Sequence, residues 1–157
     1  MKTENTNYAV VVKVMPIFGE NPNSIIEGYV KLKIGKLALT CFAPQIPGMA
    51  EFTIGDRIRV ILRMDSYKWE KTTARKKAIT EVGEVPETNG KVYAATGIVV
   101  SEELLPNNGA RLGIDCGILV YTNRWTVDTP LHKGDVVHCP AASISAYKVD
   151  VEVKNKG

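Results

Sequence analysis

The phrase "FTIGDRIRVILRMDSYKWE", from Phe52 to Glu70, decides the fold class of this chain, and "LHKGDVVHCPAASISAYKVD", from Leu131 to Asp150, repeats its plan. Each phrase has an apolar residue, a short gap, Gly-Asp, a strand-like run and then Tyr-Lys. Glycine before aspartate supplies a turn in which glycine tolerates a positive φ, and the run that follows is typical of a strand. The phrase therefore predicts one turn-and-strand element used twice.

The rest of the chain is also strand-like, with short runs rich in Val, Ile and Tyr between Gly, Pro and Asn. Examples are "YAVVVKVM", "IIEGYVKLKI", "KLALTCF", "KAITEV", "YAATGIVV" and "RLGIDCGILVYT". Helical periodicity is limited to a turn or two. The sequence predicts an all-β protein made of two small Greek-key β-barrels in tandem, with very little helix.

The best candidate for a domain boundary is "EVPETNG", from Glu84 to Gly90, which divides the chain into 1–86 and 91–157. Two further phrases match across this division: Gly28-Tyr-Val30 with Gly97-Ile-Val99, and Leu37 to Cys41 with Leu112 to Cys116. These matches favour a tandem of like barrels. One composite β domain is the alternative.

Several classes of protein are not indicated. The chain of 157 residues has no apolar stretch near the ~20 residues of a membrane span, and "MKTENTNY" at its start is not a secretory signal, so we expect a cytoplasmic protein with no membrane partner. Cys41, Cys116 and Cys139 have no metal-binding spacing and are expected to be buried, reduced thiols. No catalytic or phosphate-loop motif is present, so we expect no enzyme, cofactor or metal.

The net charge of +3 is unevenly distributed. From Arg57 to Lys77 there are eight basic residues and two acidic ones. A basic strip on a mildly acidic body is typical of a protein that binds a polyanion. A solvated, charged hairpin is the alternative interpretation.

The phase of the first phrase separates two faces, because side chains alternate along a strand. Ile58, Val60, Leu62 and Met64 form an unbroken apolar face, expected in a core. The opposite face presents arginines, then two aromatic rings, and leads into a basic hairpin. Cations that follow phosphates and flat rings that stack on unpaired bases hold single-stranded nucleic acid. The candidate binding residues are Arg57, Arg59, Arg63, Tyr67, Lys68, Trp69, Lys71, Arg75, Lys76 and Lys77. In the alternative interpretation, the outer face is merely soluble, and Tyr67 and Trp69 cover a barrel end.

From Leu37 to Val85 the chain resembles the C-terminal half of bacterial, phage and plasmid single-stranded-DNA-binding proteins of the OB-fold class. The matching pieces are "LALTCF", "FTIGD", "RIRVILR", "SYKWEKTTARKKA" and "ITEV". The resemblance implies an OB-like five-stranded barrel, with nucleic acid crossing its face and gripped by hairpin loops. The internal matches extend the expectation of an OB-like barrel to the second half. The chain departs from the family at "APQIPGMA", Ala43 to Ala50, whose two prolines oppose the usual helix.

The second half lacks the charge of the first, since Lys91 to Gly157 has seven basic and seven acidic residues. We expect it to act as a scaffold or to form an interface in a homo-oligomer. "YTNRWT" places Tyr121, Arg124 and Trp125 in an expected turn, where Trp125 either caps a barrel mouth or extends the base platform.

The sequence thus predicts a protein that binds single-stranded DNA, or RNA, without strong sequence specificity, protecting or presenting the strand in replication or recombination. The alternative is a β-barrel interaction or assembly module whose basic hairpin docks on an acidic partner.

Overall fold

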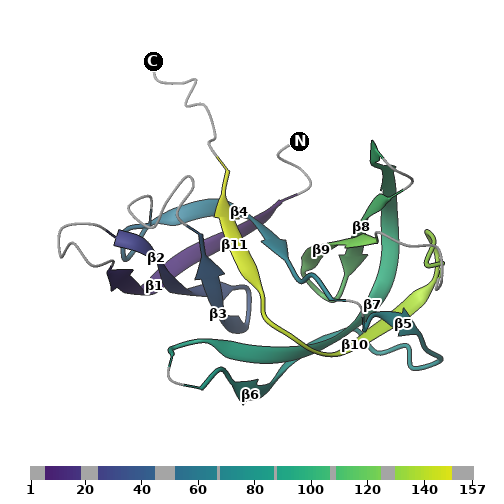
Figure 1. Ribbon diagram of the computed structural model, residues 1–157, viewed down its shortest axis with the longest axis horizontal. Coiled ribbons are helices and arrows are strands. Elements are labelled where there is room, and N and C mark those ends of the chain that lie inside the picture. The colour runs from purple at the N-terminus through teal and green to yellow at the C-terminus, as the bar shows by residue number, and fades with distance from the viewer. Residues whose placement is uncertain are drawn as a thin grey trace. The chain divides into compact units, whose positions relative to one another are not determined.

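The computed structural model describes residues 6–18, 25–44, 52–66, 68–86, 88–106, 109–124 and 130–149, with the backbone alone at 16–18, 25–27 and 124. The described residues form eleven strands and no α-helix (Figure 1). The predicted all-β class is therefore confirmed.

The chain divides into two compact units, of which the first is formed by the two ends of the chain and the second by its middle. The first unit comprises Met1–Ile61 and Ala146–Gly157, and the second comprises Leu62–Ser145. This division differs from the expected one at 84–90. That segment instead connects β6 (Ala78–Glu84) to β7 (Lys91–Leu104), which pair antiparallel within the second unit. Its turn residues therefore mark a hairpin rather than a linker.

The first unit contains a closed five-stranded β-barrel. Its strands are β1 (Asn7–Phe18), β2 (Ile25–Ile34), β3 (Leu37–Ala43), β11 (Ser145–Lys148) and β4 (Arg57–Arg63), hydrogen-bonded in that order. β1 also pairs antiparallel with β4, which closes the ring. The strand that completes the barrel, β11, comes from the far end of the chain (Figure 1).

The barrel core follows the alternation of the sequence. In β4 the predicted apolar face is confirmed, since Ile58 and Val60 are buried while Arg57, the first residue of the strand, is exposed. The other buried core residues of the barrel strands are Ala9, Val11, Val30, Leu32, Ile34, Leu39, Cys41, Ala43 and Ala146. Their burial fixes the register of each strand, because a slip by one residue would turn the apolar set outward.

The second unit is built around β7. β10 (Val136–Ala142) pairs along one edge of β7. Along the other edge lie first β6, at residues 91–96, and then β8 (Ala110–Asp115), at residues 98–104. Gly97 stands where β6 gives way to β8, and a Cβ there would overlap the carbonyl of Asp115. A glycine is required at this point because the backbone of β8 approaches it so closely.

Two further ladders complete the second unit. β9 (Leu119–Arg124) pairs antiparallel with β8, and its Tyr121 pairs in parallel with Arg63 at the end of β4. The short β5 (Glu70–Lys71) pairs antiparallel with β10. The segment from Arg63 to Thr72 thus pairs with β9 at its start and with β10 at its end.

The three cysteines are free and buried, as the sequence predicted. Burial raises the pKa of Cys41 and of Cys116 to about 12 in each case. Both thiols therefore stay protonated at neutral pH and act as small apolar side chains.

Candidate nucleic-acid interface

The outer face of the first unit is set by the register of β1 against β4. Tyr8 pairs with Arg59, and Val10 pairs with Arg57. The residues between them, Ala9 and Ile58, are buried, so alternation directs Tyr8 and both arginines to the outside. This agrees with the outer face that the sequence predicted for Arg57 and Arg59.

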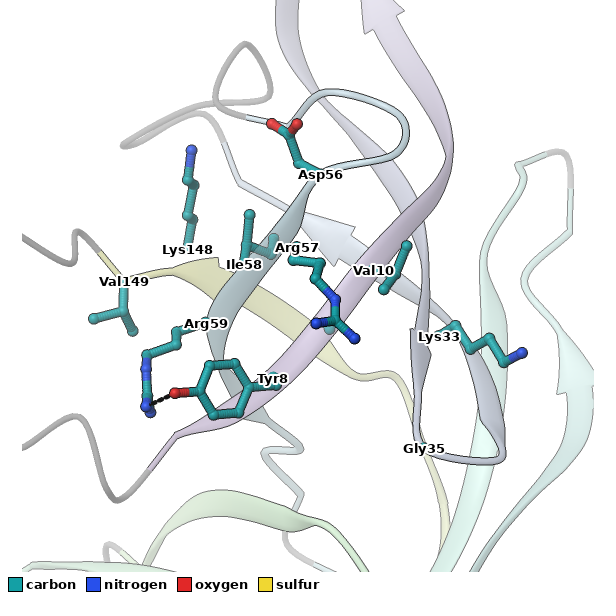
Figure 2. A pocket seen from close by; sticks show the side chains of 11 residues that line it. Tyr8, Val10, Lys33, Gly35, Asp56, Arg57, Ile58, Arg59, Lys148 and Val149 are labelled. Carbon is teal, nitrogen blue, oxygen red and sulfur yellow. Dashed lines mark hydrogen bonds between the residues drawn. The ribbon is translucent and has the colours of Figure 1, made fainter. Parts of the chain in front are cut away.

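β2 extends this face by one more strand. Val10 pairs with Lys33 of β2 as well as with Arg57 of β4, so the three residues form a row across three strands (Figure 2). Neighbouring strands lie about 4.8 Å apart, which separates the two backbone positions of the cations by about 10 Å. The row places Val10 between an ammonium group and a guanidinium group.

The row forms part of a pocket of about 1100 Å³ on the first unit (Figure 2). The pocket is lined by Tyr8, Ala9, Val10, Lys33, Gly35, Asp56, Arg57, Ile58, Arg59, Lys148 and Val149. Four of these side chains are basic and one is acidic. A cationic hollow on a sheet is a surface that attracts a polyanion, because it concentrates the positive field.

Tyr8 and Arg59 form a preassembled pair at this hollow. The guanidinium carbon of Arg59 lies 3.9 Å from the centroid of the Tyr8 ring. The guanidinium also donates a hydrogen bond to the Tyr8 hydroxyl, drawn as a dashed line in Figure 2, and its Nη1 donates to Thr6 Oγ1 at 3.0 Å. Tyr8 is nevertheless 65% exposed. The arginine is therefore held in place while the ring remains open to a ligand.

The described side chains of the first unit are strongly basic. They include one acidic residue, Asp56, and seven basic ones: Lys13, Lys31, Lys33, Lys36, Arg57, Arg59 and Lys148. Lys31 and Lys33 alternate with the buried Val30 and Leu32, so they face outward on β2. The alternation of "YVKLKI" could have identified these two lysines from the sequence.

An aromatic pair lies on the same outward side of the neighbouring strands. Tyr29 of β2 and Phe42 of β3 are directly opposite in register, and their rings meet edge to face at 5.6 Å. Both are half-buried, and both alternate with buried core residues. The sequence analysis did not select either ring.

The other predicted residues lie in the second unit, where acidic partners are common. Arg63 forms an ion pair with Asp65 at 2.8 Å. Lys71 lies 3.8 Å from a carboxylate oxygen of Asp135, and Lys77 binds Asp115 at 2.7 Å. This last contact lowers the pKa of Asp115. Lys68, Arg75 and Lys76 are exposed.

The structure corrects the expectation for Trp69. Its side chain is only 4% exposed, and its Nε1–H donates to the carbonyl oxygen of Met64 at 2.9 Å. The predicted alternation assumed that β4 continues, but the strand ends at Arg63, so the phase does not reach position 69. Trp69 belongs to the core of the second unit. Tyr67 lies outside the described residues.

The second predicted aromatic cluster is also changed. Tyr121 is buried, and burial raises its pKa. Its ring lies beside Gly113, where a Cβ would come within 3.2 Å of Tyr121 Cε1. Tyr121 therefore packs in the gap left by that glycine and has no open face for a base. Arg124 ends β9, but its side chain, like the whole of Trp125, lies outside the described residues.

Compared with known proteins, the chain matches no family model and no curated protein sequence. Nothing among the described residues forms a helix with the length and hydropathy needed to cross a bilayer. In the same described part, no group of three or more His, Cys, Asp or Glu residues is arranged to hold a metal ion.

The two units thus differ in what they offer a ligand. The first presents a basic hollow with an exposed tyrosine. In the second, carboxylates pair with three of the six predicted cations whose side chains are described, Arg63, Lys71 and Lys77. Of the predicted site, Arg57 and Arg59 lie in the hollow. Tyr8, Lys33 and Lys148 are additional members that the sequence analysis did not select.

Proposed function

We propose that this protein binds single-stranded nucleic acid, with DNA favoured over RNA, through the basic hollow of its first unit. The binding has little sequence specificity, because charges and ring faces contact features that all nucleotides share. Its role is to protect or present the strand, with no chemical step. A cytoplasmic setting and a part in replication or recombination belong to the same proposal.

One observation carries the proposal: four basic side chains from three strands of the barrel line one hollow that also exposes an aromatic ring. Lys33 comes from β2, Arg57 and Arg59 come from β4, and Lys148 comes from β11. Such a combination is what unpaired strands require, since their phosphates need cations and their bases need flat partners.

The barrel supports the proposal at the level of the fold. Numbered along the first unit, its strands are ordered first, second, third, fifth and fourth, with the first and fourth paired. This is the order of an OB barrel, the architecture implied by the resemblance to single-stranded-DNA-binding proteins. Because one fold serves many functions, the charged hollow carries more weight than the fold does.

The test is a binding titration of the whole protein with oligo-dT, the matching RNA and a duplex of equal length, at several salt concentrations. Each phosphate contacted by a cation contributes about −0.7 to the log–log slope for single strands, so four contacts give a slope of about −3. Replacing Lys33 and Arg57 together by alanine should weaken binding and reduce the slope by about 1.4. Lys36→Ala is the matched control, since Lys36 is exposed between β2 and β3 and does not line the hollow.

Absence of binding to any single strand at low salt would refute the proposal. The same hollow could instead dock an acidic protein, the alternative that the sequence left open. Nuclease-resistant capture of one defined acidic protein, with no binding of oligonucleotides, would identify that alternative.

A further inference from the structure

We infer that the exposed ring of Tyr8, held by Arg59, is the surface on which an unpaired base stacks. This inference rests on the proposed function and assigns a role to a residue outside the predicted set. Tyr8 becomes the candidate because Trp69 and Tyr121 are buried and have no accessible ring face.

The geometry of the pair explains how Tyr8 can act as a platform. The Arg59 guanidinium lies over one face of the ring and binds the hydroxyl, so the exposed area of Tyr8 lies on its remaining face and edges. Arg59 is itself anchored by Thr6. A ring that is already positioned loses little side-chain entropy when a base stacks on it.

The neighbouring charges match this role. Arg57 lies two residues from Arg59 along β4, about 7 Å away, and faces the same hollow. A phosphate next to the stacked base would find a guanidinium within reach. A duplex keeps its bases paired inside the helix, so a stacking platform favours single strands, whereas phosphate contacts alone do not.

The test compares oligo-dT with an abasic oligomer of the same length, which keeps the phosphates and lacks the bases. Tyr8→Leu removes the flat ring, and Tyr8→Phe keeps it while losing only the hydroxyl. We expect Tyr8→Leu to weaken oligo-dT binding about tenfold, to leave abasic binding within about twofold, and Tyr8→Phe to bind nearly as the wild type does.

Equal losses on both oligomers would overturn this inference, because Tyr8 would then act only by holding Arg59 against phosphates. An unchanged affinity of Tyr8→Leu would overturn it as well. Either result leaves the proposed function standing. A wild-type protein that binds neither oligomer would instead refute both.

A different observation carries a second inference, about how the chain builds its two units. In the first unit, residues 53–56 form a turn closed by a hydrogen bond from Asp56 N–H to Thr53 O at 3.1 Å. The turn docks on Val11 of β1 through two bonds: Gly55 N–H to Val11 O at 2.8 Å, and Val11 N–H to Asp56 O at 3.0 Å.

The second unit repeats this arrangement bond for bond. Asp135 N–H donates to His132 O at 3.0 Å. Gly134 N–H donates to Val99 O at 2.8 Å, and Val99 N–H donates to Asp135 O at 2.9 Å. Val99 is buried on β7 as Val11 is on β1.

The strands around the two turns also correspond. A bulge follows each docked valine, which leaves Val12 43% exposed in one unit and Val100 41% exposed in the other. β1 pairs with β2 and β4, as β7 pairs with β8 and β10. The third strands of the two units also correspond, since β3 pairs with β2 in the first unit and β9 pairs with β8 in the second.

Each unit has one more strand position, the fifth, which lies between its third and fourth strands. In the first unit β11 occupies it, between β3 and β4. In the second unit the segment from Arg63 to Thr72 pairs with β9 and with β10. We propose that the two units are copies of one barrel plan that have exchanged their fifth segments. Each fourth strand, β4 or β10, leads the chain into the fifth segment of the other unit.

The exchange is tested by amide hydrogen exchange on the full chain with two mild core variants. Ala146→Ser places a hydroxyl at a buried position of β11, and Trp69→Phe removes the indole donor to Met64. We expect Ala146→Ser to accelerate amide exchange mainly in β1 to β3, and Trp69→Phe mainly in β7 to β9. Ala146→Gly replaces the first variant if it does not fold.

A sequential tandem predicts the reverse pattern, with Ala146→Ser acting on β7 to β10 and Trp69→Phe acting on β1 to β4. That pattern would overturn the exchange. A uniform acceleration across both units would overturn it too, because the chain would then open as one body.

Discussion

At the scale of residues, two glycines define the turns on which the strand pattern depends. Gly55 and Gly134 have φ values of 94° and 97°, and each is the third residue of a four-residue turn. A type II turn needs a positive φ at this position, which glycine adopts without steric cost. No atom lies within 4 Å of a Cβ built at either glycine, so backbone conformation alone selects the residue.

We therefore predict that Gly55→Ala and Gly134→Ala each lower the free energy of unfolding by about 1–2 kcal/mol. Urea denaturation followed by circular dichroism measures the change. Gly83→Ala is the control, since Gly83 has no positive φ and a Cβ there would meet Val92 at an ordinary 3.9 Å. Gly83→Ala should leave the free energy of unfolding unchanged or raise it by up to about 1 kcal/mol. A loss at Gly83 equal to that at Gly55 would contradict the turn argument.

Strand alternation predicted the apolar core residues of the segment around β4 but not the placement of the aromatic residues. The period of two was correct for Ile58, Val60, Leu62 and Met64, which are all buried. It failed at Trp69, because alternation holds only while a strand continues and β4 ends at Arg63. Tyr8 was missed for another reason. Tyr8 becomes a candidate only because it pairs with Arg59, which lies 51 residues away in the sequence. No local sequence pattern predicts that pairing.

At the scale of elements, the repeated Gly-Asp phrase was a sound guide because a turn is specified by its own residues. The other two repeated phrases, at Gly28 and Gly97 and at Leu37 and Leu112, do not lie on equivalent strands. Gly97 lies in β7, whose pairing matches β1, whereas Gly28 lies in β2. Leu112 to Cys116 begins in β8, whose pairing matches β2 rather than β3. Short apolar phrases recur in any β protein, so they do not identify equivalent strands.

The division of the chain could not be predicted for a related reason. Turn residues at 84–90 are the same whether they join two domains or two strands of one sheet. What decides between these is the partner of each strand, and partners such as β11 and β3 lie about a hundred residues apart in the sequence. Local signals predicted the elements, and non-local pairing set the units.

At the scale of the whole molecule, the two units place different residues at equivalent positions of the outer face. Where the first unit has Arg57 and Lys33 flanking Val10, the second has Val136 and Asp115 flanking Ile98. The pair of Tyr8 and Arg59 corresponds to Thr96 and His138, which share a hydrogen bond of 2.8 Å. At these four described positions the second unit therefore has no lysine, arginine or tyrosine, and the cation beside Asp115, Lys77, is paired with that carboxylate.

This difference predicts that one chain binds one short oligonucleotide, through the first unit. Replacing Lys33 and Arg57 by alanine should weaken binding of an oligo-dT of about eight nucleotides at least tenfold, because each lost cation removes a phosphate contact. Replacing Arg75 and Lys76, two exposed cations of the second unit that the sequence selected, should weaken it less than about threefold. Isothermal titration of the full chain measures the stoichiometry and both affinities.

Both double variants remove two positive charges, so a general effect of net charge would lower the two affinities equally. Two oligonucleotides per chain, or a larger loss from the Arg75 and Lys76 variant, would contradict the assignment to the first unit. The second result would move the site to the basic connection between β5 and β6, which is the hairpin part of the site that the sequence predicted. Because Lys71 and Lys77, the basic residues on either side of Arg75 and Lys76, have carboxylate partners at 3.8 and 2.7 Å, that connection has fewer charges to offer a phosphate than the hollow has.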